Sequence, residues 1–168
     1  MKEAPALEKR EGLGPQEIID EINRCGGLSI LAHPAWSLNS ADVVIKMHGI
    51  FGTEIFNSTS SYKYNPSNAR PYSGLFVDQM AARGKMLQCV ASDDAHKYPN
   101  DSLKSYIMVH AKEKSHDAIM EAIKNGDFYA SQGPDVYIER SGDDLKITCS
   151  PCSVISVFSN LSIRPGRT

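Results

Sequence analysis

Histidines and acidic residues directly follow two apolar stretches of this sequence. His33 comes after SILA, and Asp93, Asp94 and His96 come after QCVAS. A side chain at the end of a buried strand is held firmly yet reaches solvent, which suits a metal ligand or a catalytic base. Imidazole nitrogen and carboxylate oxygen are donors that suit zinc, manganese or iron. The two stretches therefore predict one shared site, in which His33, Asp94 and His96 converge.

A third apolar stretch, residues 53–56, adds Glu54, and Asn57 follows it at the start of a long polar loop. The same loop carries two cations, Lys63 and Arg70. Both can be ordinary loop charges.

The proposed metal ligands have structural alternatives too. A histidine before proline, as at His33, is often a turn residue, and the pair Asp93-Asp94 could form a cap or a turn. The functional interpretation depends on their occurring together, at the ends of two strands.

The elements that must position these residues alternate between helix and strand. A helix opens at Pro15 and stops at Gly26, and further helices are predicted at 41–47, 75–83 and 116–124. Strands are predicted at 28–32, 53–56, 85–92 and 105–111, then a hairpin at 136–150 and a last strand at 153–159. This order predicts an α/β fold with mainly parallel strands and a small C-terminal antiparallel extension.

Composition places the chain among ordinary globular proteins. Its 168 residues are 41% hydrophobic and 23% charged, with a formal net charge of -2. No basic stripe is present that would bind a nucleic-acid backbone. No apolar run approaches a membrane span and the N-terminus has no apolar core, so we expect no membrane partner and a cytoplasmic location.

Four cysteines occur, at positions 25, 89, 149 and 152. Without a signal peptide we expect free thiols. Cys149-Ser-Pro-Cys152 has the spacing of half a zinc ribbon or of a redox pair, although two small residues at a strand end are the simpler interpretation.

Four segments in order, GGLSILAHP, GTEIFN, ASDDAH and GDFYASQGP, resemble signature segments of the PHP (polymerase and histidinol phosphatase) superfamily, in its small metal-dependent phosphoesterase branch. The resemblance extends over residues 13–158. It implies a distorted seven-stranded β/α barrel with up to three divalent metals, zinc, manganese or iron. It also implies His33, Asp94 and His96 as metal ligands, with Asp93, Glu54 and Asn57 around them.

One family motif is missing, because the sequence contains no H-x-H. The chain therefore resembles the second half of a family member: a charged lead at 1–12, a partial barrel at 13–126, and a hairpin and strand extension at 127–168. We expect the missing half to come from another segment or from a second copy in a homo-oligomer.

The resemblance implies hydrolysis of a phosphoric ester in a small phosphorylated metabolite or nucleotide, with activity incomplete in this chain. For such a substrate, Lys63 and Arg70 are the cations best placed to meet the phosphate, and arginine can bind it with two parallel hydrogen bonds. The alternative is a non-catalytic module that binds a metal or a partner.

Overall fold

The structure, a computed structural model, describes residues 11–157 and contains four helices and seven strands in that range. In chain order they are α1 (Pro15–Arg24), β1 (Ile30–Leu31), α2 (Ala41–Val44), β2 (Gly52–Asn57), α3 (Gly74–Ala81), β3 (Gln88–Ser92), β4 (Tyr106–Val109), α4 (His116–Asn125), β5 (Phe128–Ser131), β6 (Val136–Ser141) and β7 (Asp144–Cys149).

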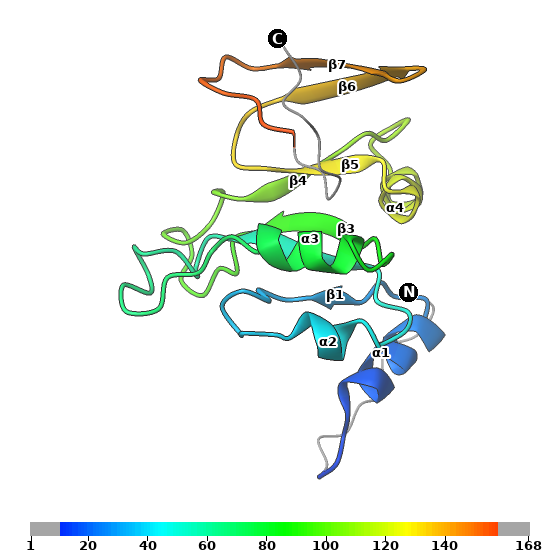
Figure 1. Cartoon of the computed structure of the whole chain (residues 1–168), viewed down its shortest axis with the longest axis vertical. Coiled ribbons are helices and arrows are strands. Elements are labelled where there is room, and N and C mark those ends of the chain that lie inside the picture. The colour runs from blue at the N-terminus through cyan, green and yellow to red at the C-terminus, as the bar shows by residue number, and fades with distance from the viewer. Residues whose placement is uncertain (1–10, 158–168) are drawn as a thin grey trace.

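The described strands form three separate sheets, which follow one another from α1 to the C-terminal hairpin (Figure 1). The first is parallel, in the order β1-β2-β3; β4 pairs with β5, and β6 pairs with β7, both antiparallel. The expectation of a partial seven-stranded β/α barrel is therefore wrong. So is the expectation of mainly parallel pairing, since only the first sheet is parallel.

The barrel does not form because its hydrogen-bonded ladder stops at β3. Strands β4 and β5 lie beside β3 but share no ladder hydrogen bonds with it. They also run antiparallel to each other across α4, whereas a β/α barrel needs every successive strand to be parallel. With β1 at the other edge of the first sheet, the three-stranded ladder stays open.

The hydrophobic core of the first sheet lies under two short helices. Val44 of α2 packs with Phe76 and Met80 of α3, and Leu87, just before β3, completes this cluster with Ala41. Lys85 donates hydrogen bonds from Nζ to the carbonyl oxygens of Val44 and Met47. The ammonium group thus binds the carbonyl oxygen at the end of α2, which also accepts from Met47 N, and one just beyond the helix. Burial lowers the pKa of Lys85.

Helix α1 is held against the turn that precedes β2. The side chain of Gln16 exchanges two hydrogen bonds with the backbone of His48, and Asn23 Nδ2 donates to the carbonyl oxygen of Gly49 at 3.0 Å. Gly49 has φ +76, and a Cβ there would lie 2.4 Å from Asn23 Nδ2. The positive φ favours glycine here, and any side chain at this position would displace the Asn23 amide that binds the Gly49 carbonyl.

Several predicted elements differ from those observed. The helix predicted at 41–47 is only four residues long, and β5 was not predicted. Residues 153–157 form no strand, and residues 158–159 of that predicted strand lie outside the described residues. Between residues 11 and 157, no helix has the length and apolar character needed to cross a membrane.

Replacing Met80 by alanine should lower the free energy of unfolding by roughly 2–5 kcal/mol, because it leaves a cavity in the core. Met80 is fully buried, with 0% exposure. Met86→Ala is the matched control, since that side chain is 80% exposed. Urea denaturation followed by circular dichroism measures both; equal losses in the two variants would contradict the assignment of the core.

Candidate functional site

A cavity of about 460 Å³ lies at the carboxyl ends of the three parallel strands. It is lined by residues from the segments that follow β1, β2 and β3: His33, Trp36, Thr59, Ser60, Asn65, Asp94 and His96. The three predicted metal ligands thus share one cavity although about sixty residues separate them in sequence. The ends of parallel strands are where open α/β sheets bind ligands.

His33 is fixed by both its backbone and its ring. Its backbone N–H donates to Glu54 Oε2 at 2.7 Å, and its Nδ1 lies 2.8 Å from Ser37 Oγ. The ring stands edge-on to Trp36, with centroids 5.1 Å apart. Its φ of 28° lies in the left-handed region, which non-glycine residues rarely adopt. The surrounding contacts hold the residue in this conformation, as is common at functional sites.

Asp94 and His96 line the cavity from the segment that follows β3. Asp94 also has a positive φ, 51°, and its Oδ2 accepts a hydrogen bond from Asn57 Nδ2 at 3.3 Å. His96 Nδ1 lies 2.7 Å from the carbonyl oxygen of Asp94. A carbonyl oxygen can only accept, so Nδ1 is the donor in this contact and carries a proton, which leaves Nε2 as the ring nitrogen that could bind a metal. Metal-binding histidines are commonly oriented by this kind of hydrogen bond.

Glu54 lies behind the cavity wall and is buried. Its Oε2 accepts from the His33 backbone and from Asn57 Nδ2 at 2.9 Å, and its Oε1 accepts from Ser92 Oγ at 2.5 Å. Both carboxylate oxygens are therefore used within the protein. Glu54 positions the residues around it instead of facing the cavity.

A β-bulge in β2 makes the contact between Glu54 and Asn57 possible. Residues three apart in a regular strand point to opposite faces of the sheet. The register of β2 against β3 shifts between Glu54 and Phe56, which leaves Ile55 as an extra residue. This insertion returns Asn57 to the face of Glu54. Asn57 Oδ1 also accepts from Ser60 N at 2.9 Å, so the same side chain fixes the start of the loop after β2.

Asp93 organises the loop that carries Asp94 and His96. Its Oδ1 accepts from the backbone N–H groups of Lys104 and Ser105, each at 2.8 Å, and its Oδ2 accepts from that of Leu103. The carboxylate therefore joins the first residue of the loop to the last ones before β4, and its role is to hold the loop.

Asp101 braces the middle of the same loop. Its Oδ2 accepts from the backbone N–H of His96 at 3.0 Å and from that of Lys97 at 2.7 Å. Desolvation acts to raise the pKa of the Asp101 carboxyl, but these hydrogen bonds outweigh it and hold that pKa below its ordinary value. The carboxylate form thus fixes the backbone of His96.

The two cations predicted to bind substrate lie outside the wall of this cavity. Lys63 Nζ stands over the ring of Tyr64, 5.3 Å from its centroid, and Arg70 Nη1 donates to Asn68 Oδ1. Their role in phosphate binding stays a prediction. Lys104 contacts the same tyrosine ring and donates to Tyr64 Oη, a hydrogen bond that lowers the pKa of Tyr64.

Four residues of the cavity wall were not predicted: Trp36, Thr59, Ser60 and Asn65. A signal existed for Trp36, which is the single tryptophan and stands three residues after His33. Thr59 Oγ1 donates to the carbonyl oxygens of Asp93 and Asp94, at 2.8 and 2.9 Å, and so joins the loops after β2 and β3. Only the tertiary fold makes this contact, so no local pattern could indicate it.

The donor types in the cavity fit a divalent transition metal, since two imidazoles and a carboxylate are ligands of zinc, manganese and iron. Their positions do not form a finished coordination shell. Within residues 11–157, no group of three or more His, Cys, Asp or Glu side chains is arranged to hold a metal ion.

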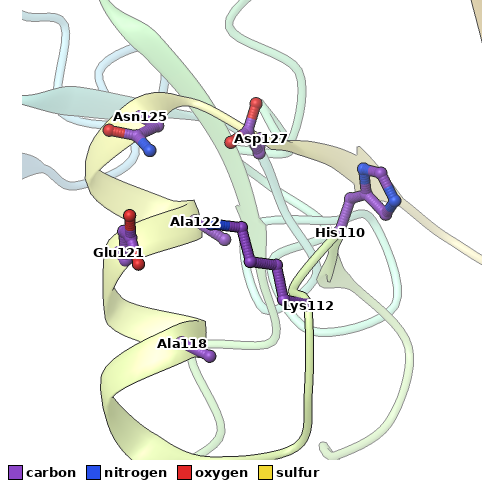
Figure 2. A pocket seen from close by; sticks show the side chains of 7 residues that line it. All are labelled: His110, Lys112, Ala118, Glu121, Ala122, Asn125 and Asp127. Atoms are coloured by element: carbon purple, nitrogen blue, oxygen red, sulfur yellow. The ribbon is translucent and has the colours of Figure 1, made fainter.

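A second cavity, of about 340 Å³, lies beside α4 and contains none of the predicted site residues. Figure 2 shows α4 as one wall, with Lys112 reaching across toward Ala122. Ala118 and Ala122 are four residues apart and so share one face of the helix, where their small side chains leave room. The remaining lining is polar and mixed in charge: His110, Glu121, Asn125 and Asp127.

Comparisons of this chain with family models, with curated proteins and with solved structures find no match.

Replacing Asp93 by asparagine should speed hydrogen exchange at the amides of Leu103, Lys104 and Ser105 by roughly tenfold or more. The variant loses hydrogen bonds to a charged acceptor, which are worth about 1.5–3 kcal/mol each. Asp117→Asn is the control, because the Asp117 side chain is 99% exposed. Exchange read by NMR or mass spectrometry measures the effect; unchanged rates in the Asp93 variant would contradict the role of this carboxylate.

Proposed function

We propose that this chain carries part of the metal centre of a metal-dependent phosphoesterase, with His33, Asp94 and His96 as its ligands. The substrate class is a small phosphorylated metabolite or nucleotide. The observation that supports the proposal is that these three side chains line one cavity, while the contact of His96 Nδ1 with the Asp94 carbonyl leaves Nε2 as the ring nitrogen available to a metal.

The surroundings of the ligands support the same proposal. In the described part of the chain, Nε2 of His33 and of His96 makes no hydrogen bond, while Nδ1 of each ring is engaged. Glu54 holds the backbone of His33, and Asp93 holds the loop that carries Asp94 and His96 by binding Ser105 N. A bound metal would supply a hydroxide near neutral pH and neutralise phosphate oxygens. The residues of this chain would bind and orient it.

A non-catalytic module that binds a metal or a partner is the second candidate. It is favoured by the use of both the Glu54 and the Asp93 carboxylates in internal hydrogen bonds, which leaves Asp94 as the one carboxylate that residues 11–157 place in the cavity wall. Metal binding does not separate the two candidates; turnover by the chain together with the part that completes the metal centre does.

We expect the chain to bind zinc or manganese weakly. Replacing a ligand should weaken binding by roughly tenfold or more, since losing even an outer partner of a ligand costs that much. His33→Asn and Asp94→Asn are preferred variants, because asparagine tolerates the positive φ at both positions. Isothermal titration calorimetry measures affinity, and His116→Ala, at a side chain 79% exposed, is the control. Equal affinity in all variants would exclude this site.

We also expect the isolated chain to hydrolyse a generic phosphomonoester slowly or not at all, because three ligands on one side of a metal do not place metals on both sides of a phosphate. The assay uses the purified chain with manganese or zinc. Robust turnover that is lost in His33→Asn or Asp94→Asn would refute this expectation and would mean that other residues, for example those of a second copy, complete the centre.

A further inference from the structure

Two cysteines at the end of the C-terminal hairpin lie side by side. Cys149 is the last residue of β7 and pairs with Val136 of β6, and its Sγ lies 3.6 Å from Sγ of Cys152. In a disulfide the two sulfur atoms are about 2.05 Å apart, so an approach of roughly 1.5 Å would form the bond. Both residues are free thiols in this structure.

The backbone around the pair is fixed by the hairpin. Ser150 N donates to the carbonyl oxygen of Asp135 at 2.9 Å, and Asp135 N donates to Ser150 Oγ at 3.0 Å. Pro151 then restricts the chain just before Cys152. The thiols are therefore held near each other by local structure, and their contact does not depend on a long flexible segment.

We propose that Cys149 and Cys152 form a reversible dithiol–disulfide site that exchanges with low-molecular-weight disulfides such as glutathione disulfide. This function is independent of the metal centre proposed above. The hairpin lies at the end of the molecule opposite α1 (Figure 1), and neither cysteine lines the cavity of His33 and His96.

The two thiols differ in solvent exposure and therefore have different roles in the exchange. Cys152 is exposed and Cys149 is partly buried, so Cys152 is the sulfur that an incoming disulfide meets first. The hydrogen bond between the two thiols, followed by partial desolvation, raises the pKa of Cys149. The other two cysteines differ, because Cys25 is only 1% exposed and burial raises the pKa of Cys89.

The exchange proceeds in two steps. The Cys152 thiolate attacks one sulfur of glutathione disulfide, which forms a mixed disulfide and releases one glutathione thiolate. The Cys149 thiolate then attacks the Cys152 sulfur, forms the Cys149–Cys152 bond and releases the second glutathione thiolate. Two electrons pass from the protein to glutathione disulfide, and the two thiol protons are taken up, through water, by the two released glutathione thiolates.

The test uses the full chain, reduced and then equilibrated with mixtures of reduced and oxidised glutathione. After acid quenching, N-ethylmaleimide blocks the remaining thiols, and trypsin releases residues 147–167, which contain Cys149 and Cys152 but neither Cys25 nor Cys89. Mass spectrometry should show this peptide losing both maleimide adducts and two hydrogens as the mixture becomes more oxidising. Reduction with dithiothreitol should restore both adducts.

The Cys152→Ser variant is the matched control, because an exposed position tolerates serine. In it the internal disulfide should be replaced by a glutathione adduct on Cys149, with an unchanged circular dichroism spectrum. The proposal is overturned if peptide 147–167 of the unmodified sequence keeps both maleimide adducts at the most oxidising ratio, carries glutathione on both cysteines, or links two chains on a non-reducing gel.

Discussion

The candidate site depends on the hydrogen bonds made by the buried carboxylate of Glu54. A carboxylate removed from water is costly unless hydrogen bonds satisfy its oxygens. Its three donors come from the segment after β1, from the end of β2 and from the end of β3. Satisfying one side chain therefore fixes three strand ends relative to one another, and the cavity lies where those ends meet.

Local signals in the sequence predicted the parts of the fold that local chemistry decides. The helix predicted at 116–124 is observed as α4, where Ser115 Oγ accepts from Ala118 N and Gly126 ends the helix with φ 79°. The hairpin predicted at 136–150 is observed as β6 and β7. Caps and turns depend on neighbours within a few residues, so the sequence pattern contains them.

Features that need distant partners could not be predicted in this way. The bulge at Ile55 becomes visible only in the register of β2 against β3, and it brings Asn57 to Glu54. The antiparallel pairing of β5 with β4 likewise depends on the position of α4, which connects the two strands. The apolar stretches located the strand ends and thus the residues of the site. They did not indicate that the hydrogen-bonded ladder of strands ends at β3.

The loop from Asp93 to Ser105 closes on itself, because the carboxylate of its first residue binds the amides of its last three. Its two ends are joined before β4 begins, and the loop after β2 also contacts those ends, where Thr59 binds Asp93 and Asp94 and Ser58 contacts Ser105. A loop of this kind is suited to replacement by another sequence. Protein engineers could vary its middle while retaining Asp93, Asp101 and the strands it connects, and so alter the rim of the cavity with little change to the fold.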